Sequence, residues 1–141
     1  VVSIGLRYVS GVCNVPFLLV HSLPVSSEQK KVLIKELTEA ICIAYEIKPD
    51  IVTIYISEFS NENYGHGGFT GLESQEKRVF IQVHAFERPL EKKRSLVKHI
   101  AEAVSGVFGI SIADVAVYIL ESDKQNASLG DVLFADSEGI S

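Results

Sequence analysis

The strongest constraint on this chain is that its sequence repeats itself. When the sequence is shifted by 63 residues, 16–58 falls on 79–121 without a gap. Chance does not produce such an ungapped match, so the chain is expected to contain two copies of one small structural unit. The fourteen identical pairs are Phe17/Phe80, Val20/Val83, His21/His84, Glu28/Glu91, Lys30/Lys93, Leu33/Leu96, Lys35/Lys98, Glu39/Glu102, Ala40/Ala103, Ile47/Ile110, Val52/Val115, Tyr55/Tyr118, Ile56/Ile119 and Glu58/Glu121.

Each copy has the pattern of a strand, a helix and a second strand. Short apolar runs at 17–23 and 80–86 predict buried first strands, and 51–57 and 115–120 predict the closing strands. Between them, apolar residues recur at helical spacing, which places them on one helix face. The first helix should open with a capping box at Ser26 and Gln29, and the second should have Pro89 at its first position.

Two strand–helix–strand units predict an α+β fold: a four-stranded sheet with both helices on one face. The uncovered sheet face favours oligomerisation as its cover. The same element order also occurs in ferredoxin-like ligand-binding regulatory modules. We expect central, adjacent and antiparallel first strands to favour that alternative.

Composition narrows the functional classes. The chain has 141 residues, a mass of 15.5 kDa and a net charge of −5, which suits one domain and argues against nucleic-acid binding. No apolar run is long enough for a membrane span. Cys13 and Cys42 lie in unrelated contexts, so we expect reduced thiols in a cytoplasmic protein.

Several segments together resemble the tautomerase superfamily. These are 16–21 at the start of a strand, 27–31 at the start of a helix, 52–58 in a closing strand, and the glycine hairpin 64–68. The chain is similar to the fused, two-unit members of that superfamily. Its first unit resembles 4-oxalocrotonate tautomerases and its second resembles cis-3-chloroacrylic acid dehalogenases.

The resemblance implies β-α-β units fused in pairs, assembly as a homotrimer, and catalysis by an N-terminal proline without a cofactor or metal. By position, Pro16 would be the proline base or acid, and Glu121 would position water. Arg88 would bind a substrate carboxylate, and Tyr64 would line the pocket. Tyr118, which repeats Tyr55, is a further candidate for substrate binding.

The sequence also departs from this pattern. Val79 replaces proline in the second unit, so at most one proline site per chain is expected. Pro16 follows Val15, and a proline nitrogen inside a chain is an amide that cannot accept a proton. We therefore divide the chain into an N-terminal extension (1–15), a first unit (16–78) and a second unit with a C-terminal tail (79–141).

These observations leave three functions open. The first is an isomerase for enol–keto proton transfer, or a related lyase or hydratase, acting on small unsaturated or 2-oxo carboxylates once Pro16 becomes the N-terminus. The second is a catalytically inactive trimeric binding or scaffold protein of the same fold. The third is the ferredoxin-like regulatory module. In the first two readings the partner is a small carboxylate ligand, with no nucleic acid or membrane.

Overall fold

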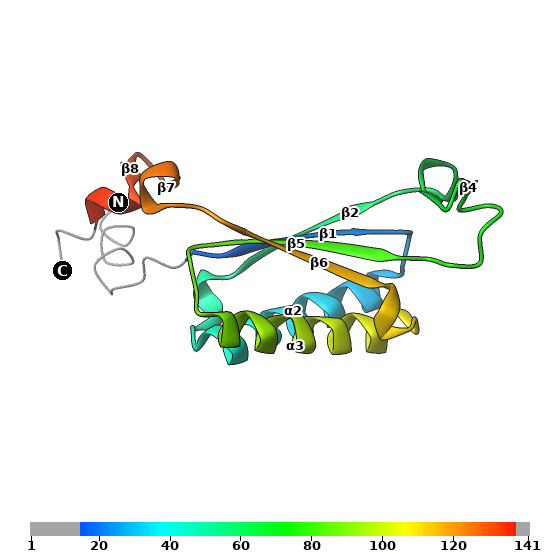
Figure 1. Ribbon diagram of the computed structural model, residues 1–141, viewed down its shortest axis with the longest axis horizontal. Helices are drawn as coiled ribbons and strands as arrows, with labels where there is room; N and C mark the ends of the chain where they lie inside the picture. Colours follow the sequence, from blue (N-terminus) through cyan, green and yellow to red (C-terminus); the bar gives the residue numbers. More distant parts are fainter. Residues whose placement is uncertain (1–14, 138–141) are drawn as a thin grey trace.

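The fold was analysed on a computed structural model that describes residues 15–137 (Figure 1). Each unit contains two long strands, a helix of 19 residues and a small terminal hairpin. The first unit comprises β1 (Phe17–Ser22), α2 (Ser27–Tyr45), η1 (Pro49–Ile51), β2 (Thr53–Glu58), η2 (Asn61–Asn63), β3 (Gly65–His66) and β4 (Phe69–Thr70). The second comprises β5 (Val79–Ala85), α3 (Leu90–Phe108), η3 (Ile112–Asp114), β6 (Val115–Glu121), η4 (Lys124–Asn126), β7 (Ser128–Leu129), β8 (Val132–Leu133) and α4 (Phe134–Ser137).

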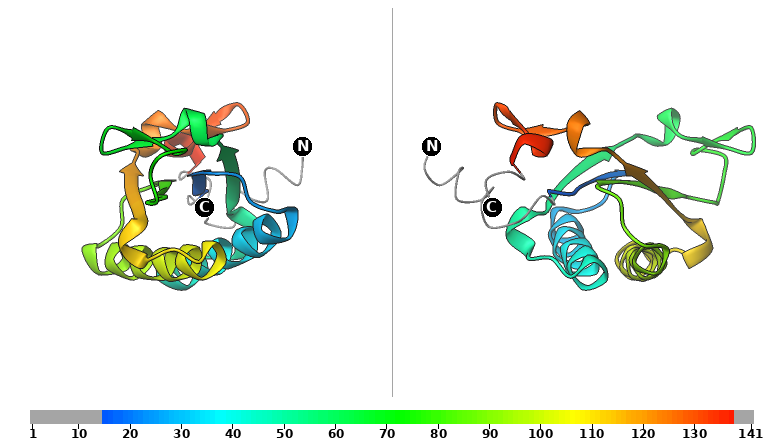
Figure 2. Two further views of the ribbon diagram at one scale, coloured as in Figure 1. Left: turned by 90° about the vertical axis from the view of Figure 1, so that its right-hand side faces the viewer. Right: turned by 60° about the vertical axis from the view of Figure 1, so that its left-hand side comes forward.

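The four long strands form one sheet in the order β2-β1-β5-β6. Within each unit the two strands pair directly and run parallel, and β1 pairs with β5 antiparallel. The predicted α+β architecture with both helices on one face is confirmed (Figures 1 and 2).

The criterion chosen to separate this fold from the ferredoxin-like one was wrong. The first strands of both units are central, adjacent and antiparallel, yet the fold is not ferredoxin-like. A ferredoxin-like sheet splits each β-α-β unit by inserting another strand. Here β1 bonds its own partner β2, and β5 bonds β6, so neither unit is split.

The core lies between the sheet and the two helices. Leu18 and Val20 of β1 and Ile81 and Val83 of β5 are fully buried against it. The alternate residues of the same strands are only partly buried, because they face the side of the sheet without helices. The central strands are therefore buried on one face only, whereas their apolar runs predicted burial on both.

The helix ends follow local chemistry. The Ser26 hydroxyl accepts from the Gln29 amide at 3.1 Å, and the Gln29 side chain accepts from the Ser26 amide at 3.0 Å, which confirms the capping box. Pro89 is the N-cap of α3 and not its first residue. Gly109 ends α3 with φ +68°, a conformation in which glycine avoids the strain of a side chain.

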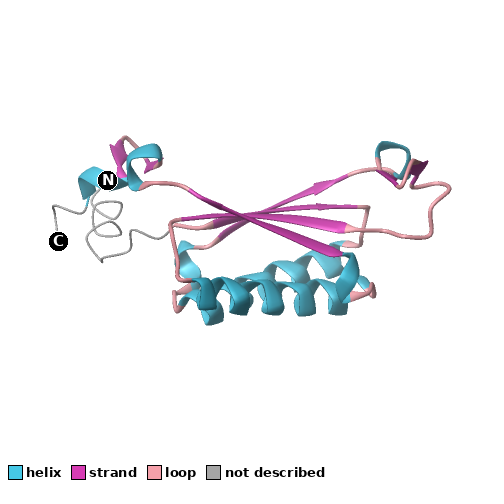
Figure 3. Ribbon diagram, in the orientation of Figure 1, coloured by secondary structure: helices cyan, strands magenta, loops and turns pink. Residues whose placement is uncertain are grey.

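The small hairpins extend the repeat beyond the segment that the sequence comparison aligned. A shift of 63 residues carries η2, β3 and β4 onto η4, β7 and β8. The first hairpin is the predicted glycine hairpin, with positive φ at Gly67 and Gly68. The two hairpins project from opposite ends of the sheet (Figure 3). Among the described residues, no helix is long and apolar enough to cross a membrane.

Candidate functional site

Glu121 forms a clamp at the end of β6. Its carboxylate accepts from the backbone amide of Arg88 at 2.8 Å and pairs with Lys93 of α3 at 2.6 Å. Burial acts to raise the pKa of Glu121, but the hydrogen bonds from Lys93 and from the Arg88 amide outweigh it, so this pKa is lowered. The carboxylate is therefore held as an anion by groups at the start of α3.

Glu58 makes the same clamp in the first unit. It accepts from the Val25 amide at 3.0 Å and pairs with Lys30 of α2 at 2.5 Å. Each partner lies 63 residues before its counterpart around Glu121. Because the first unit repeats the arrangement, the clamp is explained by its structural task of tying the strand–helix loop to the closing strand.

Arg88 is directed to its own surroundings. Its Nη1 donates to the carbonyl oxygens of Phe86 at 3.2 Å and Glu87 at 3.1 Å. Its guanidinium carbon lies 5.0 Å from the ring centre of Tyr45, in cation–π geometry. Burial lowers the pKa of Arg88, opposed by Tyr45 and Glu121. Arg88 lines a shallow cavity together with Lys124, on the far side of Phe86 and Ser122 from the cavity described below.

Tyr118 lies on the sheet face that has no helices. Its ring meets Phe80 edge to face at 5.3 Å, and Phe80 stacks with His21 at 5.2 Å. The first unit has the same arrangement, in which Tyr55 meets Phe17 at 6.3 Å and Phe17 stacks with His84 at 4.4 Å. Two related aromatic clusters thus cover the open face of the sheet.

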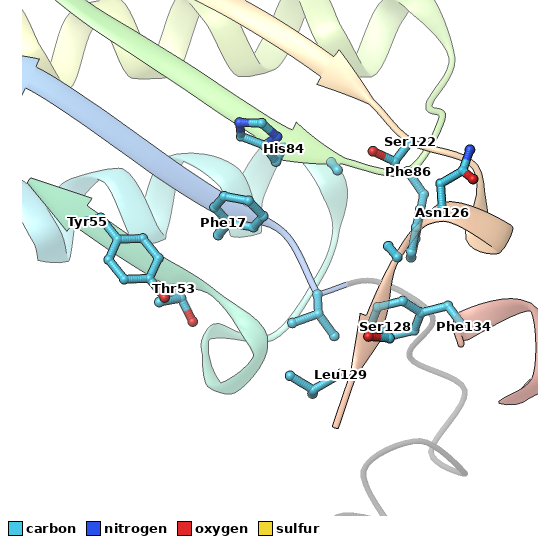
Figure 4. A pocket seen from close by; sticks show the side chains of 13 residues that line it. Phe17, Thr53, Tyr55, His84, Phe86, Ser122, Asn126, Ser128, Leu129 and Phe134 are labelled. Atoms are coloured by element: carbon cyan, nitrogen blue, oxygen red, sulfur yellow. The ribbon is translucent and has the colours of Figure 1, made fainter. Parts of the chain in front are cut away.

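A cavity of about 370 Å³ lies at the N-terminal end of β1. It is enclosed by the start of β2, the end of β5 and the second hairpin (Figure 4). Its wall is aromatic and aliphatic, with neutral hydroxyl and amide groups and one histidine. The lining residues are Val15, Phe17, Thr53, Tyr55, His84, Ala85, Phe86, Ser122, Asn126, Ala127, Ser128, Leu129 and Phe134.

Pro16 lies directly behind this cavity. Its side chain is fully buried in the core, and its carbonyl oxygen accepts from the Thr53 amide at 3.3 Å. Both neighbours in the chain, Val15 and Phe17, line the cavity. The peptide bond between Val15 and Pro16 is therefore at the cavity wall, while the proline ring points to the core.

Tyr64 lies at the opposite end of the sheet, beside the start of β5. Its hydroxyl accepts from the Arg78 amide at 2.9 Å and donates to the Glu76 carbonyl oxygen at 3.3 Å. Arg78 is the repeat counterpart of Val15, and Tyr64 is the counterpart of Ala127. The ring of Tyr64 thus lies where the second hairpin has only a methyl group.

The structure does not bring the five predicted site residues together in one pocket within the described chain. None of Pro16, Tyr64, Arg88, Tyr118 and Glu121 lines the cavity at the start of β1. The sequence analysis missed Asn126, Ala127, Leu129 and Phe134, because the alignment of the repeat was stopped at Glu121. Continuing it past that residue sets Ala127 against Tyr64 and Phe134 against Gly71, which marks the asymmetry of the two ends.

Metal binding finds no candidate among residues 15–137, in which no group of three histidine, cysteine or carboxylate side chains could hold an ion. Cys42 lies on α2, and burial raises the pKa of its thiol, followed by the effects of Asp50 and Glu39. A raised thiol pKa keeps the unreactive protonated form at neutral pH.

Sequence comparison identifies the family. Two family models, both described as tautomerase enzyme, match residues 16–70 and 66–130. The chain belongs to the tautomerase superfamily, and it contains two tautomerase units in tandem. A search of the curated proteins found no match.

Solved structures agree with this assignment at the level of the fold. A fused 4-OT wild-type asymmetric trimer is similar with a TM-score of 0.80 and 24% identity, over 85% of this chain and 97% of that chain. Pt0534 inactivated by 2-oxo-3-pentynoate follows with a TM-score of 0.79 and 19% identity, over 87% and 98%. Malonate semialdehyde decarboxylase has a TM-score of 0.70 and 19% identity, over 87% and 97%.

Proposed function

We propose that this protein is a tautomerase-superfamily isomerase whose active form begins at Pro16. The observation that carries the proposal is that Val15 and Phe17 both line the cavity at the start of β1. When the bond between Val15 and Pro16 is absent, the proline nitrogen becomes a secondary amine at the wall of that cavity. This places a base beside a space in which a small molecule can bind.

The comparisons support the position of this N-terminus. The family match begins at Pro16. The fused 4-OT chain is covered over 97% of its length by 85% of this chain, so part of this chain has no counterpart there. Removal of residues 1–15 would expose Pro16. So would translation initiated at the codon of Val15, followed by removal of the initiator residue.

The cavity favours the chemistry that such an amine performs. Apolar walls formed by Phe17, Phe86 and Phe134 disfavour the charged ammonium form, because they offer little solvation. A neutral amine can accept the proton of an enol hydroxyl while the substrate carbon takes up a proton, which completes enol-to-keto conversion. General bases in such roles contribute about 10²–10⁴-fold to the rate.

Assembly as a homotrimer is part of this proposal. One relative is described as a trimer of fused chains. In the present chain, Tyr55 and Tyr118 leave more than half of their surface exposed on the sheet face without helices. A second and third copy covering this face would bury both aromatic clusters.

The experiment compares the full chain with a chain trimmed to begin at Pro16 behind a cleavable leader. Ketonisation of phenylenolpyruvate and of its neutral methyl ester is followed by ultraviolet absorbance. We expect the trimmed chain to exceed the full chain by about 10²–10⁴-fold on at least one substrate. A folded, trimmed chain that accelerates neither reaction would refute the isomerase.

A non-enzymatic binding protein of the same fold is the second candidate. The observation in its favour is that Pro16 is joined to Val15 in this chain, so its nitrogen is an amide. In that case the cavity would bind a ligand without converting it. Ligand binding by the full chain, together with a silent trimmed chain, would support this candidate over the isomerase.

A further inference from the structure

We propose that the cavity at the start of β1 takes a neutral, single-ring ligand carrying a carbonyl or hydroxyl group, and that Ala127 keeps this cavity open. The identification of this ligand as the substrate rests on the proposed function, whereas the binding itself does not. The proposal departs from the carboxylate ligand that the family resemblance implies.

The first argument is the charge of the lining. None of its thirteen residues is a lysine, arginine, aspartate or glutamate, and His84 is the one titratable ring on the wall. A carboxylate moved from water into such a place loses its hydration without gaining a cationic partner. A carbonyl or hydroxyl group loses less, and neutral donors and acceptors such as Asn126 and Ser128 can bind it.

The nearest arginine is occupied elsewhere. Arg88 belongs to the adjoining cavity and is separated from this one by Phe86 and Ser122, which line both. Its Nη1 atom donates to two backbone carbonyl oxygens, and its guanidinium rests on the ring of Tyr45. Turning it to a carboxylate in the first cavity would break these contacts.

The second argument is size and surface. A volume of about 370 Å³ is at the small end of the range for ligand pockets, and suits a compound with one ring. Phe86 and Phe134 meet edge to face at 5.1 Å on one side, and Phe17 stacks on His84 on another (Figure 4). Aromatic walls favour a flat apolar ligand.

The third argument compares the two ends of the sheet. At the other end, Tyr64 reaches the backbone of Arg78, the counterpart of Val15, through a hydrogen bond of 2.9 Å. Its ring thus covers the strand start that Val15 leaves beside a cavity. Ala127 replaces Tyr64 in the second hairpin and cannot make this contact. The substitution of one aromatic residue by alanine accounts for an open cavity at only one of the two related ends.

The test measures binding to the full chain, so it requires no turnover. Benzamide and benzoate have nearly the same shape and differ in charge, and their affinities are compared by ligand-observed NMR titration at pH 7. We expect benzamide to bind at least tenfold more tightly. Ala127→Tyr should abolish this binding, whereas Ala113→Tyr, at an exposed position of η3, should leave it unchanged.

Two results would overturn the proposal: binding of neither compound, or benzoate binding as tightly as benzamide. Loss of benzoate binding in Arg88→Gln would then assign Arg88 to the site. Because the affinity of the unmodified chain decides the ligand class, the proposal stays testable even if Ala127→Tyr fails to fold. A neutral preference in a protein whose trimmed form is silent would refute the isomerase while leaving this inference intact.

Discussion

At the scale of single residues, the two glutamate clamps show how a repeat separates structure from function. Glu121 alone, with its lowered pKa and its contact to Arg88, resembles a catalytic carboxylate. Glu58 has the same lowered pKa, caused first by the hydrogen bond from Lys30, and the same kind of backbone partner. The end of the sheet at which Glu58 lies has no proline at the start of its first strand, since Val79 stands there.

The clamp predicts a defined pH dependence of stability. Because the folded-state pKa of Glu121 is lowered, its contribution is present above the unfolded pKa of about 4.3 and is lost as the pH falls through the folded value. Glu121→Gln should therefore reduce the free energy of unfolding at pH 7, and this difference should shrink below about pH 4. Urea unfolding at several pH values measures it.

The control for this prediction is Glu36→Gln, at an exposed position of α2. It should change stability little at any pH. A deficit of Glu121→Gln that stays constant down to pH 3 would show that the ion pair with Lys93 contributes nothing that titrates.

At the scale of elements, sequence patterns predicted the long helices and strands well, because local chemistry determines them. Ser26 and Gln29 form the capping box that their spacing indicates, and Leu33 and Leu96 lie at equivalent buried positions. The face of β1 opposite the helices was not predicted correctly, since Phe17 and Leu19 are apolar but not enclosed by this chain. Sequence apolarity does not distinguish cover by a helix from cover by another subunit.

The candidate site was less accessible to sequence reasoning than the fold. Its walls come from β1, β2, β5 and the second hairpin, so proximity depends on strand order. Pro16 marked the correct end of the sheet. Tyr64 was placed by family position, but the cavity depends on its counterpart Ala127, a residue type that carries no chemical signal of its own.

The capping box gives a prediction for the first helix. Ser26→Ala removes the acceptor for the Gln29 amide and should lower the free energy of unfolding by about 1 kcal/mol. Ser27→Ala, at the first position of α2, is the matched control and should have a much smaller effect. Thermal and urea unfolding measure both, and equal losses in the two variants would argue against the cap.

At the scale of the whole molecule, two copies of one unit produce two sheet ends with different properties. The copies share strands, helices, hairpins and glutamate clamps at a constant shift of 63 residues. They differ at Pro16 and Val79, and at Ala127 and Tyr64. Proline and the open cavity occur at the same end, which gives each chain one candidate site in place of two.

The proposed trimer can be tested through the open sheet face. Tyr118→Lys places a charge on a side chain that is 64% exposed in the single chain and would be covered in the assembly. We expect this variant to dissociate, because an unpaired buried charge is costly. Leu90→Lys, at a site 59% exposed at the start of α3, should remain trimeric. Light scattering after size-exclusion chromatography measures the mass, and a trimeric Tyr118→Lys protein would exclude this face as the interface.

The account depends most on the state of the Pro16 nitrogen. Mass spectrometry of the N-terminal peptide, from protein purified from the organism that makes it, determines that state directly. A free proline at residue 16 is the expected result, and it would put a secondary amine at the wall of the cavity. If every copy of the protein carries Val15 joined to Pro16, proton transfer by this proline is excluded.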